Sequence, residues 1–119
     1  DILVNNAGIT HLPTPLEDVA EDAFDRVLAV NAKSVYLTAR SLVPHMKSRK
    51  SGAILNLAST AGVSPRPKLN WYNASKGWMI TATKAMAAPN RNGAEGLISC
   101  HNRPAISDAG RSNRPSVAL

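Results

Sequence analysis

The sequence predicts an α/β fold built around a doubly wound parallel sheet. Apolar runs at residues 1–4 and 53–57 have the length and composition of buried strands, and a longer segment with helical character follows each of them. The resulting order of strand, helix, strand, helix is typical of crossover units in a parallel sheet. With 44% apolar residues in a chain of 119, the composition is also sufficient for a globular core.

The first strand is expected to end in a turn, because residues 5–8 are rich in asparagine and glycine. A short helical turn is expected next. Thr14 has the character of a cap residue, Pro15 stands at the first helical position and Glu17 lies three residues after the cap.

A longer helix is predicted to begin at Glu21 and Asp22, whose charges suit a helix N-terminus. One face carries residues at three- and four-residue steps: Phe24, Val27, Leu28, Asn31, Val35, Thr38 and Leu42. Asn31 is therefore expected to be buried, and a buried amide needs hydrogen-bond partners. It either bonds to the backbone and fixes the helix, or holds a water molecule that connects to Lys76.

The second strand is expected to deliver Ser59 at its C-terminal end. A loop at residues 62–68 follows, and then a helix from about Tyr72 to Ala87. In doubly wound sheets, ligands bind beyond the carboxyl ends of the strands. Because residues 7–8 and Ser59 both follow such ends, the sequence places them on one rim of the sheet.

Tyr72 and Lys76 stand four residues apart, so on a helix they lie on one face about one turn from each other. A phenol has an ordinary pKa of about 10, and bringing it to neutrality takes roughly 4 kcal/mol. An ammonium at ~4 Å, at an effective dielectric constant of ~20, supplies about that much. A lysine is therefore sufficient to activate a tyrosine as a proton exchanger.

Four blocks of sequence resemble the middle of the short-chain dehydrogenase/reductase family. They are residues 5–8 after the first strand, 30–31 within the long helix, 52–59 around the second strand, and 71–76 at the start of the last helix. Their order and spacing match the family from residue 1 to about residue 88. The resemblance implies that residues 1–88 are the central part of an NAD(P)-binding domain.

The fold implied is a partial Rossmann-like sheet that lacks the N-terminal nucleotide-binding half, since no glycine-rich phosphate loop is present in the sequence. The activity implied is hydride transfer between a secondary alcohol and a ketone. By the resemblance, Tyr72 exchanges the proton, Lys76 lowers the pKa of the phenol, Ser59 holds the substrate oxygen and Asn31 fixes a water in the proton path.

The resemblance also implies a cofactor site for NAD or NADP. Asn5, Ala7 and Gly8 would lie along the cofactor, with Asn5 steadying the sheet, and Tyr72 and Lys76 would complete the site. The blocks around Ser59 and Tyr72 are most similar to bacterial 3-oxoacyl-carrier-protein reductases and to glucose and alcohol dehydrogenases of the family. The expected substrate is accordingly a small alcohol or ketone.

Residues 89–119 are expected to be a degenerate or poorly ordered tail. Residues 97–100 resemble a strand, and residues 104–106 a degenerate form of the turn that the family places near the nicotinamide. Either this stretch has diverged or it was read partly out of frame.

The net charge of +6 raises nucleic acid as a partner, but the basic residues form no stripe, so neither nucleic acid nor a membrane is expected. The single Cys100 fits a reducing, cytoplasmic setting. His11, His45 and His101 are far apart in the sequence, so no metal site is expected.

The resemblance implies a full-length enzyme that pairs through its two long helices into a homodimer or homotetramer. Small residues on the last helix, such as Ala74 and Ser75, suit such contacts, although they also suit contacts within one chain. The alternative to an enzyme is an inactive truncated fragment or a non-catalytic fold relative that acts only in subunit association. The fragment by itself is expected to be inactive.

Overall fold

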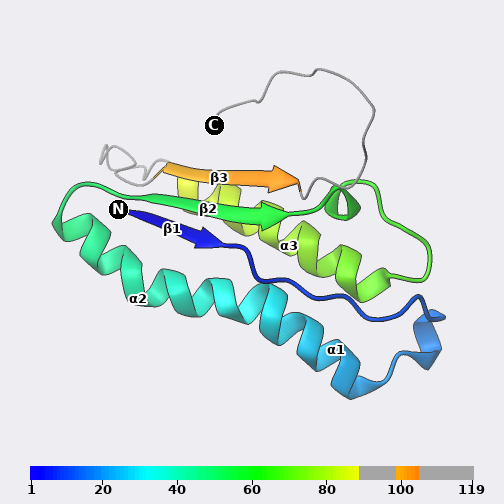
Figure 1. Cartoon of the computed structure of the whole chain (residues 1–119). Coiled ribbons are helices and arrows are strands. Elements are labelled where there is room, and N and C mark those ends of the chain that lie inside the picture. Colours follow the sequence, from blue (N-terminus) through cyan, green and yellow to red (C-terminus); the bar gives the residue numbers. More distant parts are fainter. Residues whose placement is uncertain (89–98, 105–119) are drawn as a thin grey trace.

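The computed structural model describes residues 1–88 and 99–104. Within these residues three strands form one parallel sheet (Figure 1). In their order across the sheet they are β1 (Ile2–Asn5), β2 (Ala53–Ala58) and β3 (Ser99–Pro104).

Three α-helices connect and follow the strands: α1 (Glu21–Leu28), α2 (Ser34–Ser48) and α3 (Asn70–Ala87). A five-residue π-helical turn at Ala29–Lys33 joins α1 to α2, so that the two run as one long rod in Figure 1. Short 3-10 turns at Leu16–Asp18 and Thr60–Gly62 precede α1 and α3. The predicted alternation of strands and helices in a parallel sheet is therefore confirmed.

Alternating side chains of the strands separate the two faces of the sheet. On β2 the buried residues are Ile54, Asn56 and Ala58, whereas their neighbours along the strand are only partly buried. On β1, Ile2 and Val4 remain 75% and 51% exposed. Because successive strand side chains point to opposite faces, one face packs against helices and the other is open among the described residues.

Two small apolar clusters hold the helices on that covered face. Val35 of α2, Ala58 of β2 and Met79 of α3 form one cluster. Met46 of α2 packs on Ile54 of β2 to form the other. Together they fix α2 and α3 side by side beneath the strands, which brings residues far apart in sequence to one end of the sheet.

Several local predictions were wrong in detail. Thr14 does not cap the first 3-10 turn: Pro15 takes that position, and the Thr14 hydroxyl instead donates to the Leu12 carbonyl. The helix expected from Glu21 onward is interrupted by the π-helical turn. The strand expected at residues 97–100 is described from Ser99, and it extends beyond the prediction to Pro104, while residues 97–98 lie outside the described residues.

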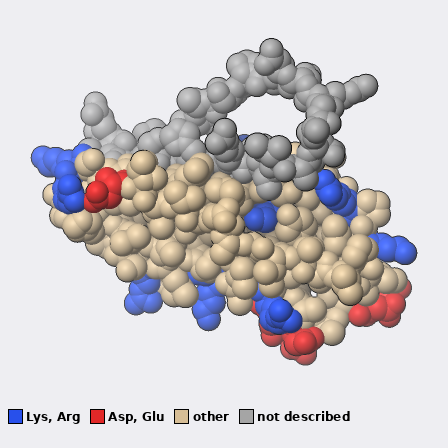
Figure 2. Space-filling view, in the orientation of Figure 1, with Lys and Arg blue, Asp and Glu red and all other residues tan. Residues whose placement is uncertain are grey.

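The predictions for the tail fall mostly on residues 89–98 and 105–119, which lie outside the described residues. On the face shown in Figure 2, lysine and arginine side chains stand apart from one another over the molecule. Within the described ranges, none of the helices combines the length and the hydropathy needed to cross a membrane.

Candidate functional site

The parallel register brings the ends of β1 and β2 to the same rim of the sheet. Asn5 at the end of β1 lies opposite Asn56 of β2, and Ser59 follows β2 directly. Tyr72 and Lys76 come from the first turns of α3, which lies against β2. The segments predicted to carry chemistry thus approach the rim from two strands and one helix.

Lys76 is the buried charge of this site, with 4% of its surface exposed. Its Nζ donates to the Leu57 carbonyl at 2.9 Å and lies 6.0 Å from the centroid of the Tyr72 ring. Burial lowers the pKa of Lys76 from its ordinary value, because an ammonium loses its hydration there. The ammonium is therefore beside the tyrosine, with a neutral oxygen as its hydrogen-bond acceptor.

Gly8 marks the point where the end of β1 meets the lysine. A Cβ atom at this position would lie 3.0 Å from Lys76 Nζ and 3.6 Å from Asn31 Oδ1. Glycine, which has no Cβ, permits this close approach of the backbone to Lys76. Three of the predicted site residues, Gly8, Asn31 and Lys76, are consequently neighbours in the structure.

Asn31 is completely buried and joins three segments. Its Oδ1 accepts from the Ile9 backbone N–H at 2.8 Å, and its Nδ2 donates to the Ile9 carbonyl at 2.8 Å and to Ser75 Oγ at 2.9 Å. Asn31 lies in the middle of the π-helical turn, a feature that often accompanies functional sites. The amide thereby ties the strand exit to α3, next to Lys76.

Ser59 is also buried and caps the 3-10 turn that follows β2. Its Oγ accepts from the Ala61 N–H at 3.2 Å, so the hydroxyl proton stays available to a further acceptor. The turn lies close against α3, because a Cβ on Gly62 would come within 2.8 Å of the backbone at Lys76 and Gly77. That close approach places Ser59 beside the helix that carries the tyrosine and the lysine.

The start of α3 is fixed by Trp71 and Asn73. Trp71 packs edge-on against Phe24 of α1, with ring centroids 5.2 Å apart and an interplanar angle of 86°. Asn73 bonds to both backbone groups of Arg66 in the preceding loop. Between them, half-buried Tyr72 starts from a backbone that is held on both sides, which favours a defined position for its hydroxyl.

A second set of hydrogen-bonded polar side chains lies between the sheet and the helices. Asn5 Nδ2 donates to Asn56 Oδ1 at 2.8 Å, and Asn5 Oδ1 accepts from Thr38 of α2 at 2.9 Å. Asn56 Nδ2 in turn donates to Thr83 of α3 at 2.9 Å. This four-residue network links two strands and two helices, and it gives the Asn5 side chain a role in steadying the sheet.

Sequence reasoning missed Asn56, Ser75 and Thr83. One signal for Asn56 was present, since it occupies an inward-facing position of an otherwise apolar strand. For Ser75 and Thr83, small polar residues on a helix, the sequence offered no comparable signal. Among the described residues, no three histidine, cysteine, aspartate or glutamate side chains gather in a way suited to a metal ion.

Comparisons with known proteins identify the family and the fold. The family model described as short chain dehydrogenase matches residues 1–93. The 4-formylbenzenesulfonate dehydrogenase TsaC1/TsaC2 of Comamonas testosteroni is 51% identical over 86 residues, which cover 72% of this chain and 34% of that protein. The chain spans about a third of the length of the curated relatives it matches.

Two solved structures share the fold. The 3-ketoacyl-(acyl-carrier-protein) reductase from Brucella melitensis, in complex with NADH, superposes with a TM-score of 0.78 at 46% identity. The match covers 86% of this chain and 43% of that one. A gluconate 5-dehydrogenase from Burkholderia cenocepacia, in complex with NADP and tartrate, gives a TM-score of 0.77 at 34% identity, covering 86% and 38%.

Proposed function

Because the chain belongs to the short-chain dehydrogenase family, we propose that the protein containing it is an NAD(P)-dependent oxidoreductase that interconverts a secondary alcohol and a ketone. One observation carries the proposal: the buried Lys76 ammonium lies beside the Tyr72 ring and has a single neutral acceptor among the described residues. A buried charge with so few partners opposes folding, so stability does not account for it. Groups in such surroundings cluster at functional sites.

Lys76 has the hydrogen-bonding capacity that the proposed role requires. An ammonium has three N–H groups, and the Leu57 carbonyl takes one of them. The other two are free to bind the phenol oxygen and the ribose hydroxyls of a nicotinamide cofactor. Gly8 is exposed and has no side chain, so a ligand can approach its backbone close to Nζ.

Tyr72 is the proposed proton exchanger. It gives its proton to the carbonyl oxygen during reduction and takes one from the hydroxyl during oxidation, while the positive charge on Lys76 favours its anionic form. Ser59 supports the same oxygen, since its hydroxyl proton is not used by its bond to Ala61. When bound, the nicotinamide supplies or accepts the hydride at the substrate carbon.

Asn31 is proposed to extend the proton path. Its two N–H groups are used by Ile9 and Ser75, and Oδ1, which accepts from the Ile9 N–H and would lie 3.6 Å from a Cβ on Gly8, keeps a second lone pair. A water molecule bonded there would connect Lys76 to solvent. Asn31 would then have both of the roles considered from the sequence, because it bonds to the backbone and also positions the water.

The cofactor would lie along the exit of β1. Ala7 and Gly8 are exposed and carry little or no side chain, which allows a close approach to their backbone. Asn5 contributes through the sheet, because its amide is already bonded to Thr38 and Asn56. Since the two solved relatives hold NADH and NADP, either dinucleotide is a candidate.

We propose further that the full protein is a cytoplasmic homodimer or homotetramer. A groove of about 750 Å³ lies between residues of α1, α2 and α3, and the aromatic side chains in its lining are Phe24, Tyr36, Trp71 and Trp78. Of these, Tyr36 and Trp78 are 53% and 44% exposed, which suits a surface covered by a second copy. The alternative is a chain that acts only in subunit association and has no catalytic activity. In that case Lys76 and Tyr72 would have no catalytic role.

Replacement of Tyr72 by Phe in the full protein tests the proposal. The variant keeps the ring and loses the proton donor, so turnover of a secondary alcohol should fall by about 10²–10⁴-fold while the unfolding transition stays unchanged. The matched control is Tyr36→Phe, which removes the hydroxyl of the other tyrosine of the chain, on α2, outside the proposed proton path and within the proposed subunit contact.

The assay should follow NAD(P)H absorbance with a panel of alcohols, ketones and aldehydes that includes 4-formylbenzenesulfonate, after the name of the relative. Near-parental activity of Tyr72→Phe would refute the assigned chemistry. A folded full protein that binds neither dinucleotide would favour the non-catalytic alternative.

A further inference from the structure

Helix α3 carries two buried hydroxyl groups with the same pattern of hydrogen bonds. Ser75 is 1% exposed and Thr83 is 2% exposed. Each hydroxyl accepts a bond from an asparagine side chain of another element, and each donates to a carbonyl of α3 about one turn earlier. The two hydroxyls differ in the residues that they connect.

Ser75 connects two residues of the proposed site. Its Oγ accepts from Asn31 Nδ2 at 2.9 Å and donates to the Tyr72 carbonyl oxygen at 2.7 Å. A carbonyl only accepts and an amide N–H only donates, so the direction of both bonds is fixed. The hydroxyl of Ser75 therefore joins the side chain of Asn31 to the backbone of Tyr72.

Thr83 connects residues of the structural network instead. Its Oγ1 accepts from Asn56 Nδ2 at 2.9 Å and donates to the Met79 carbonyl oxygen at 2.7 Å. Neither Asn56 nor Met79 is among the residues assigned to proton exchange. Thr83 is thus an internal reference for a buried hydroxyl that serves the fold alone.

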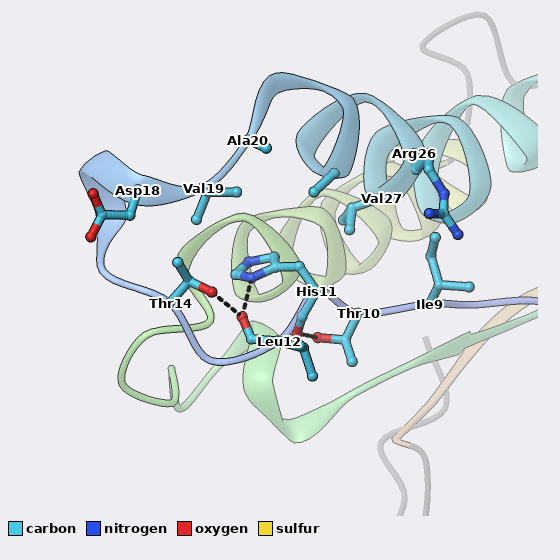
Figure 3. Close-up of a pocket in the computed structure, with 11 residues that line it drawn as sticks. Ile9, Thr10, His11, Leu12, Thr14, Asp18, Val19, Ala20, Arg26 and Val27 are labelled. Atoms are coloured by element: carbon cyan, nitrogen blue, oxygen red, sulfur yellow. Dashed lines mark hydrogen bonds between the residues drawn. The ribbon is translucent and has the colours of Figure 1, made fainter.

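The other anchor of Asn31 lies on a loop that borders a cavity. Asn31 bonds to both backbone groups of Ile9, and Ile9 lines a cavity of about 510 Å³ between this loop and α1 (Figure 3). Val19 and Val27 belong to the same lining. Atoms that border a cavity lack packing partners on that side, so the loop supports Asn31 less firmly than a packed element would. Ser75 supplies support from the opposite element, α3.

We propose that Ser75 is a positioning residue for proton exchange, because it holds Asn31 and Tyr72 in a fixed relation to each other. This inference rests on the proposed oxidoreductase function, in which Asn31 positions a water beside Lys76 and Tyr72 exchanges the proton. Ser75 acts through these residues and not on the substrate, since its hydroxyl is buried and its proton is used within α3.

The proton path needs such a link because it crosses from one element to another. Asn31 lies in the π-helical turn at Ala29–Lys33, whereas Tyr72 and Lys76 lie on α3. Among the described residues, the bond from Asn31 to Ser75 is the hydrogen bond that joins this turn to α3. A displacement of catalytic groups by about 1 Å can lower a rate by roughly 10²-fold, so the loss of this bond should be visible in turnover.

Ser75→Ala in the full protein removes the hydroxyl and keeps a good helix former. Turnover per folded molecule, followed by NAD(P)H absorbance, should fall by about 10- to 100-fold. KM should stay close to the parental value, because no proposed substrate contact is lost. Ser75→Thr keeps a hydroxyl that can bond to a carbonyl three or four residues earlier in a helix, so it should restore most of the turnover.

Thr83→Val is the matched control, because it removes a buried hydroxyl with the same pattern of bonds from the same helix. It should leave turnover per folded molecule unchanged, whatever its effect on stability. NMR of the side-chain amides gives a readout that does not depend on activity. In Ser75→Ala one Nδ2 proton of Asn31 should move upfield, as expected for a lost hydrogen bond, and in Thr83→Val the change should appear at Asn56.

Two outcomes would overturn the proposal. One is equal turnover per folded molecule in Ser75→Ala and Thr83→Val, which would make both hydroxyls structural. The other is an unchanged Asn31 amide in Ser75→Ala, which would remove the link itself. Tyr72→Phe, measured in parallel, separates these failures from a failure of the proposed function. Its turnover should collapse if Tyr72 exchanges the proton, whether or not Ser75 positions it, and would stay near the parental value if the function were wrong.

Discussion

Two buried polar clusters lie in the layer between the sheet and the helices, and they differ in charge. The middle cluster joins Asn5 and Asn56 to threonines of α2 and α3 and contains no ionised group. The rim cluster contains the hydrogen bond from Asn31 to Ser75 and the neighbouring Lys76. Lys76 carries an ammonium and is only 4% exposed.

The difference separates groups that stabilise the fold from groups that are held for chemistry. In the middle cluster each amide bonds to side chains of neighbouring elements, so burial is matched by hydrogen bonds. At the rim, Lys76 retains N–H groups beyond the one that Leu57 accepts. Substitutions should therefore separate the two clusters, with lost activity at the rim and lost stability in the middle.

Among substitutions within the two clusters, the largest effect is expected for Lys76→Met. Turnover should fall by about 10²-fold or more, because the charge beside Tyr72 and a proposed cofactor contact are both removed. The residual activity should shift to higher pH, and cofactor affinity should weaken. Since an apolar side chain of similar length replaces a buried charge, the free energy of unfolding should stay equal or rise.

A pH–rate profile and urea unfolding of the full protein measure the two effects of Lys76→Met. Lys84→Met changes an exposed lysine on the same helix and serves as the control. A strong loss of stability in Lys76→Met with unchanged turnover would contradict this assignment, because the rim cluster would then stabilise the fold and would not serve activity.

The next effect is expected for Asn56→Ala. It removes the acceptor of Asn5 and the donor to Thr83, so unfolding in urea should show a loss of about 2–3 kcal/mol. Activity per folded molecule should remain close to the parental value, because neither lost bond involves Ser59, Tyr72 or Lys76 and because Asn5 keeps its bond to Thr38.

A double-mutant cycle with Thr83→Val checks that the Asn56 effect comes from the network. The two substitutions should cost less together than the sum of their separate costs, since they share one hydrogen bond. Strict additivity, or a loss of turnover as large as that of Lys76→Met, would argue against a purely structural middle cluster.

The smallest effect is a pH dependence of stability. Burial lowers the pKa of Lys76 below its ordinary 10.5, so between the two values the unfolded state binds more protons than the folded state. The free energy of unfolding should therefore rise with pH as the pH climbs toward 10.5. This rise should be missing in Lys76→Met and present in Lys84→Met, as measured by urea titrations at a series of alkaline pH values.

Much of the fold was predictable from the sequence because it depends on local signals. Apolar runs gave β1 and β2 to within a residue at either end, and the helix predicted from about Tyr72 is observed from Asn70. The π-helical turn was not predictable, because helical periodicity continues through Ala29–Lys33. Thr14 was misassigned because its hydroxyl donates to the Leu12 carbonyl and accepts no capping bond from an N–H of the 3-10 turn.

The sequence by itself determined the family and the order of the site residues along the chain. The alternation of elements fixes which loops share a rim, and Tyr72 and Lys76 share a helix face through spacing alone. These properties are local or follow from chain order. They needed no knowledge of which side chains meet.

Only the tertiary structure decided which side chains are hydrogen-bond partners of one another. Asn5 and Asn56 are 51 residues apart and meet because of the register of β1 on β2, and Asn31 and Ser75 are 44 apart. The burial of Lys76 likewise depends on which elements close around it. Hydrogen bonds and desolvation act over a few ångströms in space, and distance along the chain does not encode them.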